Sequence, residues 1–295
     1  MSVNLSTSLF YGRTTGTIQS LQSKLDTLYN QASTGKKLIA PSDDSVGYQR
    51  LQGIVRANAD GVQDLATVKL AQAVLQQAGT AIGQISDQLQ RASELVIQGR
   101  TGTNSATGRT AIATELEGLL TSIVALANGK DVRGAPLFGG KDDGAAVTQD
   151  VAALRFAPGK ASPLPIGDGQ HVEVSVNAET FLKTDAGDLA SALNAIITAL
   201  RGDGEVPADA ADTLKAIGDQ TTATQASLGA RAARVDIQAA QIANAADDRE
   251  IARTGIEDAD ITATITELQK TITILQATQA SFSKLSSLSL FDYLR

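Results

Sequence analysis

The stretch Gly35–Gly47, GKKLIAPSDDSVG, lies between two segments with helical periodicity, and its interpretation decides the fold. Paired aspartates in such a loop can bind a metal, act as an acid and a base, or begin a helix. Pro41 biases the residue before it away from helical geometry, and Ser42 can cap the amide groups that begin a helix. Asp43 and Asp44 would then lie in the first turn, where the helix dipole favours negative charge. We therefore predict a joint between two helices at Pro41, Ser42, Asp43 and Asp44, and no catalytic role is needed to explain it.

The beginning of the same stretch predicts the end of the preceding helix. Gly35 can adopt the left-handed conformation that commonly follows the last helical residue. Lys36 and Lys37 come next, so we expect them close to the negative end of that helix. The whole stretch then consists of a helix end, a short connector and a helix start.

Apolar residues at alternating steps of three and four are the strongest pattern in the rest of the chain. They predict helices over the ladders Ile18–Ala32, Val68–Val96, Ile112–Leu126 and Ile261–Phe282. Stripes this narrow need partner helices, so we predict a coiled coil between the two ends of the chain. The residues predicted to form the assembly or coiled-coil interface are Ile18, Leu21, Leu25, Leu28, Ile261, Ile265, Leu268, Ile272, Leu275 and Phe282. At about 1.5 Å per residue, a helix from Asp43 to near Gln98 would be roughly 80 Å long.

The segment from Phe138 to Val206 differs from its flanks, because glycine and proline cluster there. Within it, Val172, Val174 and Val176 alternate with polar residues, which predicts a half-buried strand. The sequence DLASALNAIITALR, residues 188–201, predicts a helix. The expected fold is therefore mainly α: a long coiled-coil helical rod formed by N- and C-terminal segments, with a small inserted β-containing domain.

Composition excludes several classes of function. The formal net charge is −7 and the pI is near 4.8, whereas nucleic-acid binding needs a concentrated basic face. Without cysteine, disulfides, thiol nucleophiles and zinc–thiolate sites are excluded. His171 is the only histidine, so we expect no histidine-rich metal site, no catalytic residues and no cofactor. No run approaches the roughly 18 apolar residues needed to span a bilayer, so we expect no membrane insertion.

Four stretches together carry a family resemblance. Residues 33–51, STGKKLIAPSDDSVGYQRL, look like the amino-terminal signature of bacterial flagellins and hook-associated proteins. Residues 89–116 and 125–140, the latter ALANGKDVRGAPLFGG with an Asn-x-x-Asp-x-x-Gly spacing, are similar to segments of the same superfamily. Residues 265–295 resemble its carboxyl end. Within the superfamily, LFGG and the ending LSLFDYL are more similar to the hook–filament junction branch, hook-associated protein 3, than to flagellin proper.

The resemblance implies an extracellular, non-enzymatic subunit of the bacterial flagellum. It implies export through the flagellar type III channel, and the amino terminus lacks the pattern of an ordinary secretory signal. Implied partners are further copies of the chain, other hook-associated proteins, flagellin and an export chaperone. The implied division has five parts: 1–40, N-terminal inner coiled coil; 41–140, N-terminal part of a helical rod; 141–205, inserted outer domain; 206–255, C-terminal part of the rod; 256–295, C-terminal inner coiled coil.

The expected function is a structural adaptor that joins the hook to the filament by helix–helix packing. The alternative is a flagellin that forms the filament itself. A third hypothesis is a cell-surface protein that binds a polysaccharide through the insert, although aromatic residues make up only 3% of the chain. In flagellins the positions that match Arg91, Leu95 and Glu115 contribute to recognition by an innate immune receptor, and the resemblance extends that hypothesis to these residues.

Overall fold

The computed structural model describes residues 2–101, 104–140, 144–150, 153–159, 163–167, 169–202 and 204–293. These residues form seven α-helices and three two-stranded antiparallel ladders. The chain divides into two compact units. Unit 1 contains residues 1–59 and 246–295, and unit 2 contains residues 60–245. Helices α2 (Ser45–Arg100) and α6 (Ala208–Glu257) contribute residues to both units.

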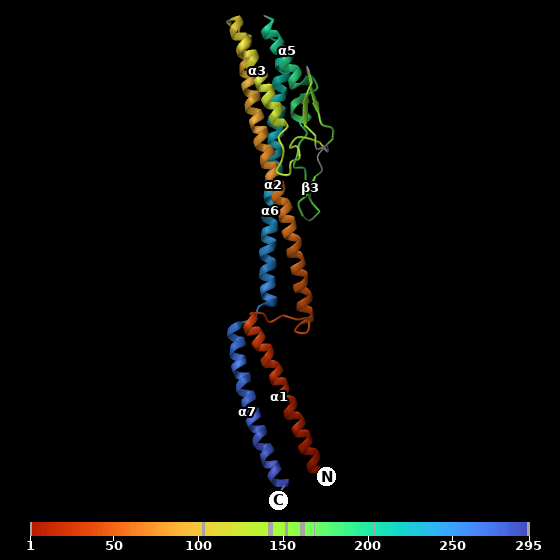
Figure 1. The fold of residues 1–295 in the computed structure, drawn as a ribbon, viewed down its shortest axis with the longest axis vertical. Coiled ribbons are helices and arrows are strands. Elements are labelled where there is room, and N and C mark those ends of the chain that lie inside the picture. Colours follow the sequence, from red (N-terminus) through yellow and green to blue (C-terminus); the bar gives the residue numbers. More distant parts are fainter. Residues whose placement is uncertain are drawn as a thin grey trace. The chain divides into compact units, whose positions relative to one another are not determined.

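Unit 1 is built around two helices from opposite ends of the chain. Helices α1 (Ser2–Thr34) and α7 (Ile261–Tyr293) lie side by side (Figure 1). The ammonium group of Lys24 lies 2.5 Å from a carboxylate oxygen of Glu267 across this pair. The predicted pairing of the two terminal segments is therefore present within one chain.

Unit 2 has a helical core whose position the periodicity predicts. Every position of the ladder on α2 is at most 3% exposed: Val68, Ala71, Leu75, Ala78, Ile82, Ile85, Leu89, Ala92 and Val96. Helix α3 (Ala106–Ala127), capped by the Ser105 side chain, buries the face that carries Ile112, Leu116 and Ile123. Each fully buried aliphatic side chain of this kind stabilises a fold by about 1.5–3 kcal/mol. Helix α2 has 56 residues, which corresponds to about 84 Å and confirms the expected long helix.

The strand-bearing part of unit 2 packs beside its helices (Figure 1). Strands β1 (Val147–Gln149) and β2 (Leu154–Phe156) pair with Val147 opposite Phe156. The remaining elements are β3 (Leu164–Pro165) with β4 (His171–Val172), the short helix α4 (Glu179–Leu182), β5 (Lys183–Thr184) with β6 (Gly187–Asp188), and α5 (Leu189–Arg201). Helix α5 confirms the helix predicted over residues 188–201. The mainly α fold with a small β-containing insert is likewise confirmed.

The strand predicted through Val176 is wrong beyond Val172. Val172 and Val174 are buried as expected, but residues 173–178 have no strand partner among the described residues. Their polar groups instead bond to the LFGG segment. The Ser175 hydroxyl donates to the carbonyl oxygen of Leu137 at 2.6 Å, and the Ala178 amide donates to that of Phe138 at 2.9 Å.

The LFGG segment anchors the insert to the helices. Phe138 is fully buried, and its ring packs edge-on against Phe181 with centroids 5.2 Å apart. Gly140 lies so close to the following loop that an added Cβ would be 2.0 Å from the carbonyl oxygen of Pro158. The residue types of this motif therefore have a packing explanation.

Helix α3 is, by length and composition alone, apolar enough to cross a membrane. One of its faces lies in the core of unit 2, and it packs against α5. Glu115 and Glu117 lie on the two edges of this buried face, and they pair with Arg91 and Arg201 at 2.8 Å in each case. This arrangement is that of a core helix in a folded unit.

Gly140→Ala should destabilise unit 2 by about 1–3 kcal/mol, because the new methyl group must displace backbone. Gly144→Ala is the matched control, since nothing lies within 4 Å of its added Cβ, and it should change stability by less than about 0.5 kcal/mol. Urea denaturation followed by circular dichroism measures both. Equal stabilities of the two variants would contradict the close approach at Gly140.

Candidate functional site: an assembly interface and its connectors

Helix α1 ends at the predicted glycine. Gly35 has φ +72° and donates its amide to the carbonyl oxygen of Gln31 at 2.9 Å. We predicted that the two lysines that follow would act on the end of α1. Their ammonium groups contact the end of α6 instead. The Lys37 ammonium donates to the Gly255 carbonyl oxygen at 2.9 Å, and Lys36 forms an ion pair with Glu257. Both cations therefore neutralise the negative end of a different helix.

Ser42 is not the helix cap, and the first turn of α2 contains neither aspartate. Pro41 and Ser42 occupy the centre of a tight turn, which the Asp43 amide closes on the Ala40 carbonyl oxygen at 3.0 Å. Proline favours this turn position, and the helix consequently begins only at Ser45. These findings correct the predicted roles of three residues in the joint.

The two aspartates have separate tasks. Asp43 accepts the amides of Ile39 and Ala40, at 3.0 and 2.8 Å, and these bonds lower its pKa. Asp44 accepts the amides of Val46 and Gly47, both at 3.0 Å, and is therefore the cap of α2. Asp43 thus closes the connector, and Asp44 starts the helix.

The connector after α1 is bonded to the connector between α6 and α7. The Lys37 amide donates to the Glu257 carbonyl oxygen at 2.7 Å, and the Ala259 amide donates to the Gly35 carbonyl oxygen at 2.8 Å. Asp260 then caps α7 by accepting the Ala263 amide at 3.0 Å. Both helix breaks of unit 1 therefore lie at one place.

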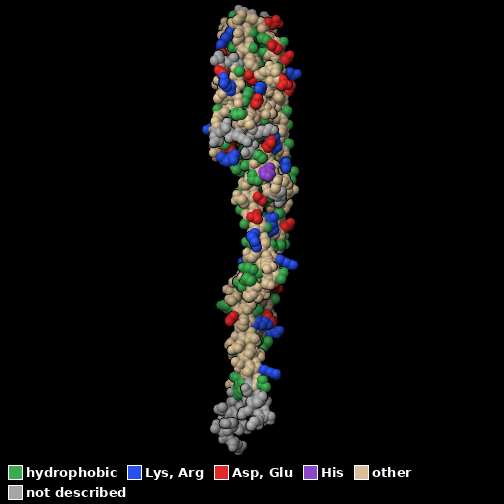
Figure 2. Space-filling model, turned by 90° about the vertical axis from the view of Figure 1, so that its right-hand side faces the viewer, with side chains coloured by type: hydrophobic (Ala, Val, Ile, Leu, Met, Phe, Trp, Pro, Cys, Tyr) green, Lys and Arg blue, Asp and Glu red, His purple; other side chains and the backbone are tan. Residues whose placement is uncertain are grey.

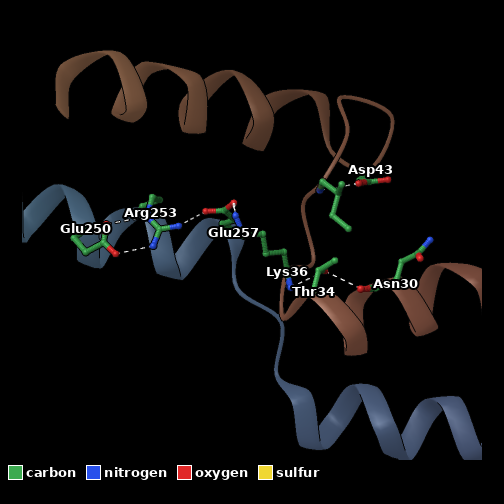
Figure 3. Close-up of polar contacts among 8 residues, drawn as sticks. Asn30, Thr34, Lys36, Asp43, Glu250, Arg253 and Glu257 are labelled. Carbon is green, nitrogen blue, oxygen red and sulfur yellow. Dashed lines mark hydrogen bonds and ion pairs between the residues drawn. The ribbon is translucent and has the colours of Figure 1, made fainter. Parts of the chain in front are cut away.

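Glu257 is the residue of this contact that the sequence did not predict (Figure 3). Its carboxylate is 9% exposed and pairs with Lys36 and Arg253. The same Arg253 guanidinium donates to both oxygens of Glu250, at 2.8 and 2.6 Å. The hydrogen bond from Lys36, followed by that from Arg253, lowers the pKa of Glu257. The sequence feature that could have indicated Glu257 is the spacing of four residues between Arg253 and Glu257, which permits an ion pair on one helix face.

The predicted interface on α1 faces α7, but only in part. Ile18, Leu21 and Leu25 are half-buried, and Leu28 is buried. Near the other end of the pair, the Tyr11 ring contacts that of Phe282 edge-on, with centroids 5.3 Å apart. This half of the predicted ladder lies in the seam.

The predicted ladder on α7 is split between two faces. Leu268, Leu275 and Phe282 are half-buried, and the buried positions are Thr264 and Thr271. Each buried threonine is 8% exposed or less; the Thr271 hydroxyl donates to the Glu267 carbonyl oxygen of its own helix at 2.7 Å. That bond satisfies the hydroxyl and permits its burial.

The remaining predicted residues of α7 form an exposed ridge. Ile261, Ile265 and Ile272 are 39%, 42% and 39% exposed. At 100° per residue they share one side of the helix, which is rotated away from the threonine positions. These residues do not lie in the seam with α1, so their place in an assembly interface stays a prediction. We call these three residues the isoleucine ridge.

The three residues proposed for receptor recognition do not form one surface. Arg91 donates from Nε to Glu115 at 2.8 Å, and both side chains are exposed. Leu95, however, is 2% exposed in the core of unit 2. A partner cannot contact Leu95 on this structure, so the prediction is wrong for that residue.

The side chains of the Asn-x-x-Asp-x-x-Gly motif, residues 128–134, fix the local backbone by hydrogen bonds. The Asn128 side chain exchanges two hydrogen bonds with the backbone of Val147, at 2.8 and 2.9 Å. Asp131 accepts the amides of Arg133 and Ala135, at 2.8 and 3.0 Å, and Gly134 has φ +84°. Burial tends to raise the pKa of Asp131, but the bonds from Arg133 outweigh it and lower the pKa.

The described residues do not include a cluster of side chains suited to hold a metal ion. Among the described residues, no three His, Cys, Asp or Glu side chains are grouped to hold a metal ion. On the face that Figure 2 shows, the described Lys and Arg side chains are interspersed with Asp and Glu. The features that do stand out are the paired terminal helices, their connectors and the isoleucine ridge, which are features of a helical structural protein.

Comparisons with known proteins identify the family. Residues 5–143 match the bacterial flagellin N-terminal helical region, and residues 212–294 match the bacterial flagellin C-terminal helical region. These matches span most of the chain, which belongs to the bacterial flagellin family. Membership in this family indicates a structural protein.

The similar proteins include hook-associated ones. The chain is 24% identical to flagellar hook-associated protein 3 of Escherichia coli (strain K12), over 98% of this chain and 99% of that protein. It is 28% identical to the Salmonella typhimurium protein of that name, over 47% of this chain and 44% of that protein. The crystal structure of the flagellar junction protein FlgL from Legionella pneumophila has a TM-score of 0.59 at 11% identity, covering 72% of this chain and all of that one.

Asp44→Ala should destabilise the start of α2 by about 1 kcal/mol, because two amides lose their acceptor. Ser42→Ala should change stability by less than about 0.5 kcal/mol, since Ser42 is exposed and does not cap the helix. Urea denaturation of both variants measures the difference. A larger loss for Ser42→Ala than for Asp44→Ala would restore Ser42 as the cap.

Proposed function

We propose that this chain is a structural adaptor that joins the flagellar hook to the filament. Its support is the family membership together with the near full-length similarity to a hook-associated protein 3. The adaptor works by helix packing: α1 and α7 pair within the chain, and further helix faces pack against neighbouring subunits.

The isoleucine ridge is the observation that carries this mechanism. Within the chain, α7 uses buried threonines and half-buried leucines toward α1, and the three isoleucines of the ridge stay 39–42% exposed on one side of the helix. A row of exposed aliphatic side chains on a long helix lowers the solubility of the protein. Covering that row with a second helix buries apolar surface and stabilises the complex of the two helices. We propose that the terminal helices α1 and α7 of a neighbouring copy of this chain cover the ridge in the assembly.

The five-part division follows from this proposal. The helix breaks at residues 35–44 and 258–260 support a boundary near residues 40 and 256 between an inner coiled coil and a helical rod. The strand-bearing residues between 141 and 205 would form the outer domain. Export would use the flagellar type III channel, with other hook-associated proteins, flagellin and an export chaperone as the remaining partners.

Replacing the ridge should separate folding from assembly. Ile265→Ser with Ile272→Ser should leave the helical content of the purified chain nearly unchanged, because both side chains are substantially exposed. The same double variant should fall to less than about a tenth of the wild-type amount in purified flagella, since two buried aliphatic contacts are lost. Circular dichroism and immunoblotting measure the two effects.

Ile97→Ser is the matched control, because Ile97 is an isoleucine that is 67% exposed on α2 and is not part of this ridge. It should incorporate at the wild-type level. Wild-type incorporation of the double variant would contradict the proposed interface.

A flagellin role is the remaining alternative, and a deletion strain separates the two. Cells that lack this chain should carry bare hooks and release filament protein into the medium if it is an adaptor. Electron microscopy of the cells and immunoblotting of the medium measure this outcome. Loss of the filament protein itself would instead identify the chain as the flagellin.

A further inference from the structure

Asn128 and Gly129 form a chemically labile pair at the end of α3, in unit 2. Asn128 is the only asparagine of the sequence that glycine follows. In a flexible chain, the backbone nitrogen of the next residue can attack the side-chain carbonyl carbon of an asparagine. Glycine favours this attack, because it has no Cβ to obstruct the approach and its backbone rotates freely. Asn128 is therefore the asparagine of this chain most susceptible to deamidation in an unfolded state.

The deamidation of such a pair needs only water. The Gly129 nitrogen loses its proton and forms a bond to Cγ of Asn128, and the bond from Cγ to Nδ2 breaks. Nδ2 leaves with that proton as ammonia, and a cyclic succinimide remains. Water then opens the ring at either carbonyl carbon, which gives aspartate or isoaspartate at position 128.

The folded structure holds both reacting groups in other bonds. Nδ2 of Asn128 donates to the Val147 carbonyl oxygen at 2.8 Å, and Oδ1 accepts the Val147 amide at 2.9 Å. The Gly129 amide donates to the Leu126 carbonyl oxygen at 3.0 Å, which disfavours the loss of its proton. Turning Cγ of Asn128 toward the Gly129 nitrogen would break both side-chain bonds to β1.

Packing explains why the fold keeps this labile pair. The Asn128 side chain both donates to and accepts from one backbone position, whereas an ionised aspartate can only accept. A Cβ added to Gly129 would lie 3.1 Å from the Leu126 carbonyl oxygen and 3.4 Å from Cδ1 of Leu137. A larger residue would therefore crowd the end of α3. Two separate packing requirements thus place an asparagine before a glycine.

We propose that Asn128 is a modification site whose deamidation is controlled by the docking of β1 on α3. Asn128 persists while β1 is docked, and it deamidates when β1 detaches or the chain is unfolded. Aspartate presents a carboxylate to the Val147 carbonyl oxygen, and isoaspartate lengthens the backbone by one methylene group. Both products oppose renewed docking of β1, whose Val147 is 1% exposed. A chain that stays unfolded is thereby converted irreversibly into one with a loosened insert.

Peptide mapping of the full-length chain by mass spectrometry tests the control by folding. At mildly alkaline pH, deamidation of Asn128 should be at least about tenfold slower in the native chain than in urea. In urea, Gly129→Ala should slow it several-fold, because the new methyl group obstructs the attack. Equal rates in the native chain and in urea would overturn the proposal, as would an Asn128 that persists in urea.

Val147→Asp tests the dependence on β1 without denaturant. The substitution places a charge at a buried position, so it should detach β1 and make deamidation of Asn128 about tenfold faster. Thr148→Asp is the matched control, because Thr148 is the exposed neighbour in the same strand, and it should leave the rate unchanged. Circular dichroism checks that both variants keep the helical content of the wild type. Equal rates in the two variants would contradict the role of β1.

Asn128→Asp supplies one product directly and tests its effect on the insert. The Ala157 amide donates to the Ala146 carbonyl oxygen at 2.9 Å, next to the pairing of β1 with β2, so its hydrogen exchange reports local opening there. We expect that exchange to be about tenfold faster in Asn128→Asp. Asn244→Asp, the same change at an exposed residue of α6, should leave it unchanged. Wild-type exchange in Asn128→Asp would show that β1 docks on the product and would overturn the proposed loosening.

Discussion

A helix with a narrow apolar stripe cannot bury that stripe by itself, and this constraint organises unit 1. For α1, the partner helix is α7, from the opposite end of the sequence. Isolated helices are marginal in water, so most of their stability must come from such packing. The fold of the terminal segments is therefore a property of the pair, and neither end has a complete environment alone.

The helix breaks follow from the same constraint. Once both ends of the chain are paired, the connectors that lead into them are brought together, and their unpaired backbone groups can bond to each other. Buried or half-buried backbone groups need such partners. The lysines after Gly35 then act on the end of α6, and the acid that ends α6 acts on the connector. The ends of α1 and α6 and the starts of α2 and α7 therefore all lie at one contact region.

The sequence predicted the core of unit 2 well, because every ladder position of α2 meets other apolar side chains within the unit. It could not predict the rotation of α7, since a threonine row and an isoleucine row both repeat along that helix and only the partner selects one. Three capping residues compete within Ser42–Asp44, and the turn at Pro41 decides among them. The Lys36–Glu257 pair joins residues far apart in the chain, so no local spacing could reveal it.

We propose that this flagellin-family chain occupies the boundary between hook and filament. Electron cryo-microscopy of intact flagella, with the chain located by its side-chain density, tests that claim most directly. If the chain is an adaptor, a short ring of copies should lie between hook and filament, with the isoleucine ridge covered by a neighbouring copy. Density for this chain repeated along the filament would contradict the adaptor and make the chain a filament subunit.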